Sequence, residues 1–114
     1  MTFSQLYFSL EGRISRSTFW LKLILPLTII LYAFLFIDIA LEAEGVIYII
    51  AALVLLWPNI AAGVKRLHDR NKSAWWLLIT LIPIAGVIWY LIDVGILKGT
   101  EGDNQFGPDP LASS

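Results

Sequence analysis

Three long apolar stretches constrain this chain more than any other feature of its sequence. Two of them, 46–64 and 74–92, contain no Asp, Glu, Lys or Arg, and a third, 19–41, carries charges only near its ends. Crossing a bilayer takes about 20 mostly apolar residues, and these stretches are apolar all round rather than on one face. The sequence therefore predicts three transmembrane helices, at 19–41, 46–64 and 74–97.

The composition agrees with a membrane protein and excludes several other classes. Among 114 residues 58% are hydrophobic and 15% are charged, whereas a soluble domain carries about 25% charged residues. With this few charged residues, the chain could not cover the surface that a soluble enzyme of its size exposes. The absence of cysteine excludes disulfides and thiolate-ligated metals, and a single histidine cannot form a multi-histidine site. We expect no cofactor, no metal and no catalytic residue.

The third apolar stretch leaves two topologies open. Pro83 and Gly86 interrupt it, and a proline close to a glycine can break a helix. A kinked helix that spans the membrane is the favoured interpretation. The alternative is a re-entrant segment, which would bring the C-terminal tail back to the cytoplasmic face; backbone that leaves helical structure inside lipid needs cover from protein or water.

Basic residues give the orientation. Arg13, Arg16 and Lys22 flank the start of the first span and four more basic residues lie between the second and third spans, whereas the loop after the first span is acidic and only Lys98 follows the third span. Because short cytoplasmic loops are enriched in Lys and Arg, we expect a cytoplasmic N-terminus. With three spans, the tail at 98–114 would lie outside, in the periplasm.

The two ends of the chain differ in character. Thr2 and Gln5 have the spacing of a capping box, and apolar residues at helical spacing predict an amphipathic helix over 3–12 that lies in the membrane interface. The tail is rich in turn formers. The predicted fold is all-α: a single membrane domain, 1–114, with a three-helix bundle, an interfacial helix and an irregular polar tail.

The loop between the second and third spans is the densest polar stretch. Its simplest interpretation is a basic loop that sets topology and attracts anionic lipid headgroups; a more specific docking site for a partner is the alternative. A catalytic pair of His68 and Asp69 is disfavoured, since adjacent helical residues point in different directions and no nucleophile accompanies them. The candidate contact residues for a partner or headgroup are Arg13, Arg16, Lys65, Arg66, His68, Asp69, Arg70 and Lys72.

Other side chains have predicted roles within the membrane. Aromatic residues at the starts of spans, Phe19, Trp20, Trp75 and Trp76, are candidate interface anchors. Asn59, deep in the second span, is expected to hydrogen-bond a neighbouring helix, because a buried amide in lipid needs a partner. Small residues in the second and third spans favour close packing, and a homo-oligomer or a complex with another membrane protein is expected.

Several motifs together resemble a known family. These are Gly12-Arg13, Ser15-Arg16 and Phe19-Trp20; Lys65 to Asp69 with Lys72 to Trp76; Ile82-Pro83 with Gly86; and Gly99 to Gly102 with Asn104 and Phe106 to Pro110. The chain is similar to domain-of-unknown-function family 805, small bacterial inner-membrane proteins of the YhaH type. The resemblance implies an inner-membrane location but no settled activity. It also suggests that Arg13 or Arg16 pairs with Asp69 as a structural clamp.

Two function classes follow. The first is a non-enzymatic membrane protein that acts by binding, as a scaffold, an accessory subunit or a regulator that contacts lipid or a partner through its basic loop. The second is a small oligomeric transporter or channel, which requires a polar path lined by Thr28, Asn59 or Thr80. Because so few polar groups lie at depth, the first is favoured. Nothing beyond a short basic loop points to nucleic acid.

Overall fold

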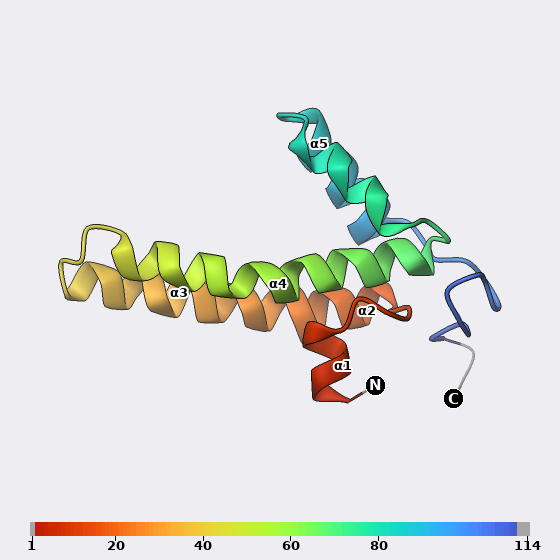
Figure 1. The fold of residues 1–114 in the computed structure, drawn as a ribbon, viewed down its shortest axis with the longest axis horizontal. Helices are drawn as coiled ribbons and strands as arrows, with labels where there is room; N and C mark the ends of the chain where they lie inside the picture. Colours follow the sequence, from red (N-terminus) through yellow and green to blue (C-terminus); the bar gives the residue numbers. More distant parts are fainter. Residues whose placement is uncertain (1, 112–114) are drawn as a thin grey trace.

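The computed structural model describes residues 2–111 and is helical almost throughout. Its body is a pair of long helices that lie side by side and run in opposite directions (Figure 1). Within residues 2–111 the β-structure amounts to one bridge between Asn104 and Gly107. The all-α prediction is confirmed for this range. The predicted three-helix bundle is not, because two helices rather than three are long and apolar enough to cross a membrane.

The first long helix runs from residue 16 to residue 40 without a break. It begins as α2 (Arg16–Thr18), continues through the π-helical η1 (Phe19–Ile24) and ends as α3 (Leu25–Ala40). Ser15 caps its start, since the Ser15 hydroxyl accepts a hydrogen bond from the Thr18 backbone N–H at 3.4 Å. Serine is favoured at this position for that reason.

The second long helix, α4 (Val46–Asp69), extends past the predicted end at residue 64, so the basic residues that follow are helical. Pro58 lies inside it and lacks the N–H that a helix needs. The neighbouring Asn59 donates its side-chain amide to the Leu55 carbonyl at 2.9 Å. This bond of the Asn59 side chain lies within its own helix.

A short turn joins the two long helices at what we call the acidic end, formed by Asp38 and residues 41–45. The buried Asp38 carboxylate accepts hydrogen bonds from the backbone N–H groups of Gly45, at 2.9 Å, and Tyr48, at 3.1 Å. These donors belong to the start of α4, where unpaired N–H groups and the helix dipole favour a negative charge. Asp38 thus fixes the turn between the two helices.

The third apolar stretch does not form the predicted helix over 74–97. It forms the 3-10 helix η2 (Ala74–Leu81), reverses direction, and returns as α5 (Ala85–Trp89) and the π-helical η3 (Tyr90–Ile96). We call residues 74–96 the apolar hairpin. Its arms are so close that a Cβ on Gly86 would overlap the backbone of Ile79 and Thr80. In Figure 1 the hairpin leaves α4 obliquely, with its tip directed away from the helix pair.

The reversal has a local cause. A residue before proline avoids the α region, and Ile82 is accordingly extended, with φ −78° and ψ 117°. The next bend is a γ-turn centred on Ile84, with φ 65° and ψ −63°, closed by a 2.7 Å hydrogen bond from the Ala85 N–H to the Pro83 carbonyl. This form of γ-turn is rare and strained, particularly for a β-branched residue. The single spanning helix was therefore a wrong prediction.

The N-terminal helix, α1 (Phe3–Phe8), is shorter than predicted and ends at Phe8 rather than near Gly12. The capping box is present, because the side chains of Thr2 and Gln5 each accept a hydrogen bond from the other's backbone N–H. α1 packs against α4, and in the view of Figure 1 it lies on the opposite side of α4 from the hairpin. Trp57 of α4 donates to the Phe8 carbonyl at 2.8 Å.

The small hydrophobic core lies at one end of the helix pair. It joins side chains from the N-terminal segment, η1, α4 and η3, namely Ile14, Phe19, Leu23, Ala62, Leu67 and Val94. Gly63 lets Leu77 and Tyr90 of the hairpin approach α4, since a Cβ there would lie 3.3 Å and 3.2 Å from their side chains. Elsewhere the long helices expose large apolar side chains such as Leu53 and Val54, as surfaces that contact lipid do.

Candidate functional site

The end of the molecule opposite the acidic turn gathers the polar motifs of the sequence. We call it the basic end, formed by residues 5–22, 65–73 and 93–111. The N-terminal segment, the end of α4 and the tail meet here through hydrogen bonds between residues far apart in sequence. The structure thus places the tail beside the basic loop, because the hairpin returns the chain to its starting end, whereas the three-span prediction puts the tail and the loop on opposite sides of a membrane.

Asp69, the last residue of α4, is the centre of this end and is 3% exposed. One carboxylate oxygen accepts from Arg13, with Nη2 at 2.9 Å and Nε at 3.1 Å. The other accepts from Arg66 Nη1 at 2.5 Å. Two arginines around one carboxylate leave a net positive cluster, buried where an unpaired charge would be costly. Of the two arginines proposed to clamp Asp69, the structure pairs Arg13.

The two guanidinium groups also bind backbone carbonyls of the segments around them. Arg66, fully buried, donates to the carbonyls of Ile14, Val94 and Leu97 at 3.2, 2.7 and 2.7 Å. Arg13 donates to the carbonyls of Thr100, Gly102 and Gly107 at 2.6, 2.8 and 3.0 Å. A planar guanidinium with five donors suits this role. We call Arg13, Arg66 and Asp69 the buried ion cluster.

Glycine positions explain part of the tail motif. A Cβ on Gly99 would overlap the Asp69 carboxylate, so this position needs a residue without a side chain. The next residue, Thr100, donates its backbone N–H to the Asp69 carbonyl at 2.6 Å. On the other side of the cluster, Gly95 lets Trp20 approach, and the Trp20 indole donates to the Gly95 carbonyl at 2.8 Å.

A second buried aspartate, Asp93, holds the base of the apolar hairpin. Its carboxylate accepts from Arg70 Nε at 2.8 Å, from the Lys72 ammonium, and from the Trp89 indole at 3.0 Å. Lys72 and Arg70 follow α4 directly, so this group ties the start of the hairpin to its end. Because the chain reverses between η2 and α5, Asp93 lies at the basic end rather than at the far end of a single helix over 74–97.

His68 has no catalytic partner in this arrangement. Its Nδ1 lies 2.9 Å from the Gly12 carbonyl, and its ring stacks on Phe106 at 4.1 Å between centroids with 6° between planes. Asp69 is directed toward the arginines instead. Asn104 donates to the His68 carbonyl at 2.9 Å, so His68 serves to attach the tail. Among residues 2–111 there is also no group of three acidic, histidine or cysteine side chains suited to a metal.

The predicted contact residues therefore divide into two groups. Arg13, Lys65, Arg66 and Asp69 are buried and bonded within the protein; the Lys65 ammonium, for example, donates to the carbonyls of Gln5 and Leu6 at the end of α1. Those with side chains at or near the surface are Arg16, His68, Arg70 and Lys72. This second group has side-chain surface that a headgroup or partner could contact, although its members also bond within the protein.

The aromatic residues predicted as interface anchors also divide. Phe19 is fully buried in the core, whereas Trp20 is 37% exposed and donates to the Gly95 carbonyl. Trp75 and Trp76, at the start of the hairpin, are 77% and 44% exposed, and the Lys72 ammonium lies 4.8 Å from the Trp76 ring centroid. An exposed tryptophan beside a cation is typical of the headgroup level of a membrane.

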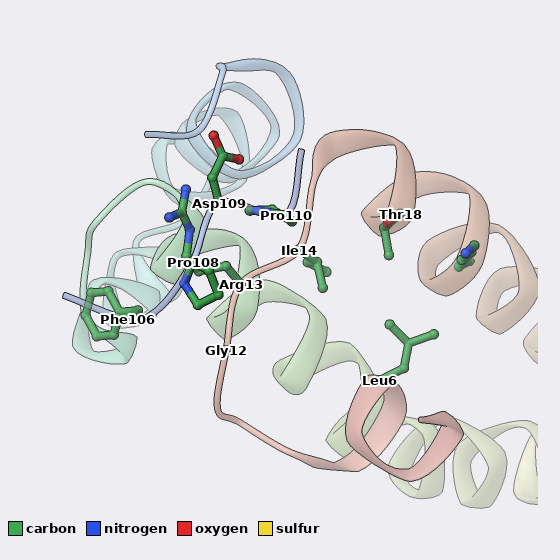
Figure 2. A pocket seen from close by; sticks show the side chains of 10 residues that line it. Leu6, Gly12, Arg13, Ile14, Thr18, Phe106, Pro108, Asp109 and Pro110 are labelled. Carbon is green, nitrogen blue, oxygen red and sulfur yellow. The ribbon is translucent and has the colours of Figure 1, made fainter. Parts of the chain in front are cut away.

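A pocket of about 650 Å³ opens beside the buried ion cluster, between the N-terminal segment and the tail. Figure 2 shows Leu6, Ile14 and Thr18 directed toward a common space, with Asp109 and Pro110 of the tail on the other side of the segment that carries Arg13. Backbone N–H groups of Leu111 and Gly102 donate to Asp109 and hold its pKa below the ordinary value. Lys22, which also lines the pocket, is exposed and forms no ion pair within residues 2–111.

Sequence reasoning missed several of these residues. Lys22 counted only as a topological charge, Thr18 carried no signal, and Asp109 was visible only as part of the tail motif, since the pocket exists only once the tail folds back. Gly99 was visible as part of a motif without a stated role. The available signal was the pairing of a glycine-rich tail with an arginine near the N-terminus, because a buried guanidinium needs carbonyl acceptors.

The chain is similar to several known bacterial proteins. The chain is 34% identical over 110 residues to "Inner membrane protein YhaH" of Escherichia coli K12, covering 91% of this chain and 88% of the relative. It is 32% identical to "Uncharacterized protein YiiR" of the same strain in an alignment 137 residues long, which covers 96% of this chain and 90% of the relative. It is 29% identical over 112 residues to "Inner membrane protein YhaI" of that strain, covering 95% of this chain and 91% of the relative.

No solved structure matches the chain. The sequence model of the family described as "Protein of unknown function (DUF805)" matches residues 7–108, a range that contains the whole of the buried ion cluster and its carbonyl partners. The chain belongs to the DUF805 family, whose relatives named above include inner membrane proteins.

Proposed function

We propose that this chain is a non-enzymatic integral membrane protein of the bacterial inner membrane, and that it acts by binding an anionic phospholipid at its basic end. The observation that carries this is the pocket, which combines an exposed cation with apolar walls at the start of the first long helix. The basic end would face the cytoplasm, because all Lys and Arg residues lie at this end once the tail returns to it.

The lining of the pocket suits an amphiphilic ligand. Lys22 and Thr18 supply an ammonium and a hydroxyl for a phosphate, while Leu6, Ile14 and Phe106 supply apolar contacts. A pocket of about 650 Å³ is in the usual range for a small ligand. Lys22 belongs to the first turns of a membrane-length helix, where a lysine reaches the headgroup level. Asp109 disfavours an anion on its own side, so the phosphate would bind beside Lys22.

The buried ion cluster supports this role by fixing the walls. Arg13 bonds to three carbonyls of the tail and to Asp69 of α4, so both sides of the pocket are held by the same side chain. A site preorganised in this way loses less entropy on binding. The alternative of a transporter gains no support, since Asn59 and Thr80 each donate to a carbonyl of their own segment, Leu55 and Leu77.

The test is a lipid-binding measurement on the purified full chain in mild detergent, with short-chain phosphatidylglycerol and phosphatidylethanolamine as the probes. We expect saturable binding of phosphatidylglycerol, weakened about fivefold by Lys22→Gln, since a basic residue near an anionic headgroup contributes about 1 kcal/mol. Lys98→Gln is the matched control, because Lys98 is an exposed lysine of the same end that pairs with Glu101 outside the pocket lining.

Two outcomes would contradict the proposal. Equal weakening by Lys22→Gln and Lys98→Gln would mean general attraction to positive charge rather than a site. Equal affinity for phosphatidylethanolamine would remove the selectivity for an anionic headgroup. Thr18→Val provides a second variant, and we expect it to weaken phosphatidylglycerol binding without changing the net charge of the protein.

A further inference from the structure

We propose that the apolar hairpin inserts into the acyl chains of a single leaflet, the leaflet on the side of the basic end, and does not cross the membrane. Two long helices would then make the only crossings among residues 2–111, and the N-terminal segment and tail would share one face. This concerns the topology of the chain, so it goes beyond the proposed lipid site and does not depend on it.

The lengths of the arms fit one leaflet. η2 has eight residues, which at the 3-10 rise span about 16 Å. α5 and η3 have five and seven residues, which at the α-helical rise span about 18 Å. Half of a bilayer's hydrocarbon core is about 15 Å. Each arm is thus long enough to reach the bilayer centre and too short to cross.

The distribution of polar groups points the same way. Residues 74–92 carry no charge, and the side chains toward the tip are exposed and apolar, among them Leu81, Ile82 and Ile84. All charges of this region are at the base, where Arg70 and Lys72 bind Asp93. The exposed Trp76 lies beside them, with the Lys72 ammonium over its ring, at the level expected for a headgroup region. An exposed apolar surface with a basic and aromatic base is complementary to one leaflet of a membrane.

Most backbone N–H groups of the tip have acceptors within the hairpin, which reduces the main objection to a re-entrant segment, that lipid offers no hydrogen-bond partners. The N–H groups of Ile82, Ala85 and Gly86 donate within the hairpin, to the carbonyls of Ile79, Pro83 and Ile82 at 3.0, 2.7 and 2.9 Å. Pro83 has no N–H to satisfy. The turn therefore exposes few unpaired backbone N–H groups. Gly86 permits these short bonds, because without a side chain it lets the two arms of the hairpin touch.

The position of the hairpin completes the case. Its base is attached to the end of α4, and it packs there against Gly63. In Figure 1 it runs from the basic end obliquely back toward the acidic end, as an element would that enters the bilayer beside α4. A single spanning helix would instead put Lys98 and the tail at the acidic end, away from Arg70 and Arg13, which donate to the Lys98 and Gly102 carbonyls.

The test uses single cysteines in this cysteine-free chain, expressed at full length in spheroplasts and treated with a membrane-impermeant thiol reagent. The positions are Glu44→Cys in the acidic turn, Asn71→Cys before the hairpin and Asp103→Cys after it. We expect the last two to behave alike and oppositely to Glu44→Cys. Labelling of Asp103→Cys together with Glu44→Cys, but without Asn71→Cys, would show a third crossing and overturn the proposal.

A depth measurement separates insertion from a hairpin that lies on the surface. A fluorophore on Ile84→Cys, or on Leu81→Cys if the first variant folds poorly, is quenched in vesicles by lipids spin-labelled at shallow or deep acyl positions. We expect the deep label to quench more at the tip and at the control Leu53→Cys, within the apolar part of α4, and the shallow label to quench more at Ser73→Cys. Stronger shallow quenching at the tip, or cross-linking of the tip between two copies with no lipid quenching, would refute insertion.

Discussion

The two ends of α4 each bury an aspartate, and they stabilise it by different means. At the start of the helix, Asp38 is held by two backbone N–H donors. At the end of the helix, Asp69 is held by two guanidinium groups. The difference follows from the helix dipole, which favours an anion at the N-terminus and opposes one at the C-terminus. A carboxylate at the C-terminal end therefore needs cations. The two arginines that supply the positive charge also hydrogen-bond the other segments of the basic end.

This difference has a structural consequence. Backbone donors are local, so Asp38 orders only the turn between the two long helices. Arginine side chains are long and have several donors, so Arg13 and Arg66 connect Asp69 to carbonyls of the N-terminal segment, η3 and the tail. One end of α4 is thus a simple turn, whereas the other gathers most of the long-range polar contacts of the chain.

The largest effect is expected from Asp69→Asn. The substitution leaves two buried guanidinium groups without a counter-charge, and breaking a buried pair in this way destabilises by about 3–5 kcal/mol. Thermal unfolding in detergent, followed by circular dichroism, is the measurement. An unchanged midpoint would mean that the cluster carries no stability. The double variant Arg13→Met with Asp69→Asn should lose less than the sum of the single losses, since the two residues are in contact.

Gly99→Ala should be the next largest. The new methyl group would overlap the Asp69 carboxylate, and overpacking of this kind costs about 1–3 kcal/mol. Gly102→Ala is not a neutral control, because Gly102 has a φ of +74°. Thr100→Ser is a better one, since the Thr100 contacts of the cluster use its backbone. If Gly99→Ala unfolds at the wild-type temperature, the tail does not approach Asp69 as described.

Asp38→Asn should destabilise by less than half as much as Asp69→Asn. The amide oxygen that replaces the carboxylate can still accept from a backbone N–H, and the donors at risk are neutral groups rather than charges. The same thermal unfolding experiment compares the two variants directly. An Asp38→Asn effect equal to that of Asp69→Asn would mean that the two ends do not differ in the way described above.

The smallest effect is expected at Glu101, whose pairing with Lys98 is exposed on both sides. Glu101→Gln should leave the unfolding midpoint unchanged at pH 7, because exposed pairs are screened by solvent. The Lys98 ammonium holds the pKa of Glu101 below its ordinary value. Any stability that the pair adds is therefore complete above the ordinary pKa of Glu101 and is lost only as the pH falls through the lowered pKa. Because that stability is small and does not change between pH 7 and pH 5, wild type and variant should unfold at the same temperature throughout this range.

The sequence predicted the elements that depend on local or compositional signals. Uninterrupted apolar runs gave both long helices, and the Thr2 and Gln5 spacing gave the cap of α1. The pairing of Arg13 with Asp69 came from the family motifs rather than from the residues themselves. These features were accessible because each depends on neighbours in sequence, on a sum over many residues, or on motifs already associated with one another.

The hairpin and the ordered tail were not accessible for a physical reason. Mean hydropathy is the same for one helix that crosses a membrane and for two arms that each cross half of it, so residues 74–92 could be either. Pro83 and Gly86 signalled a break, but the contacts that decide the outcome are long-range, such as Arg70 with Asp93. Likewise, turn formers in the tail suggest an irregular segment until Arg13 supplies donors to Gly102 and Gly107.

The reach of Arg13 also has a consequence for how the protein is made. Its carbonyl partners lie 87 to 94 residues later in the chain, and domains and their parts fold as they leave the ribosome, the N-terminal parts first. Both long helices can enter the membrane before the segment around Thr100 has been synthesised. Until then the Arg13 guanidinium lacks its carbonyl acceptors in the tail. The basic end therefore closes late in biogenesis. In a chain cut short before that segment, the Arg13 guanidinium would lack the tail carbonyls that cover it, and cellular proteases could recognise the incomplete protein.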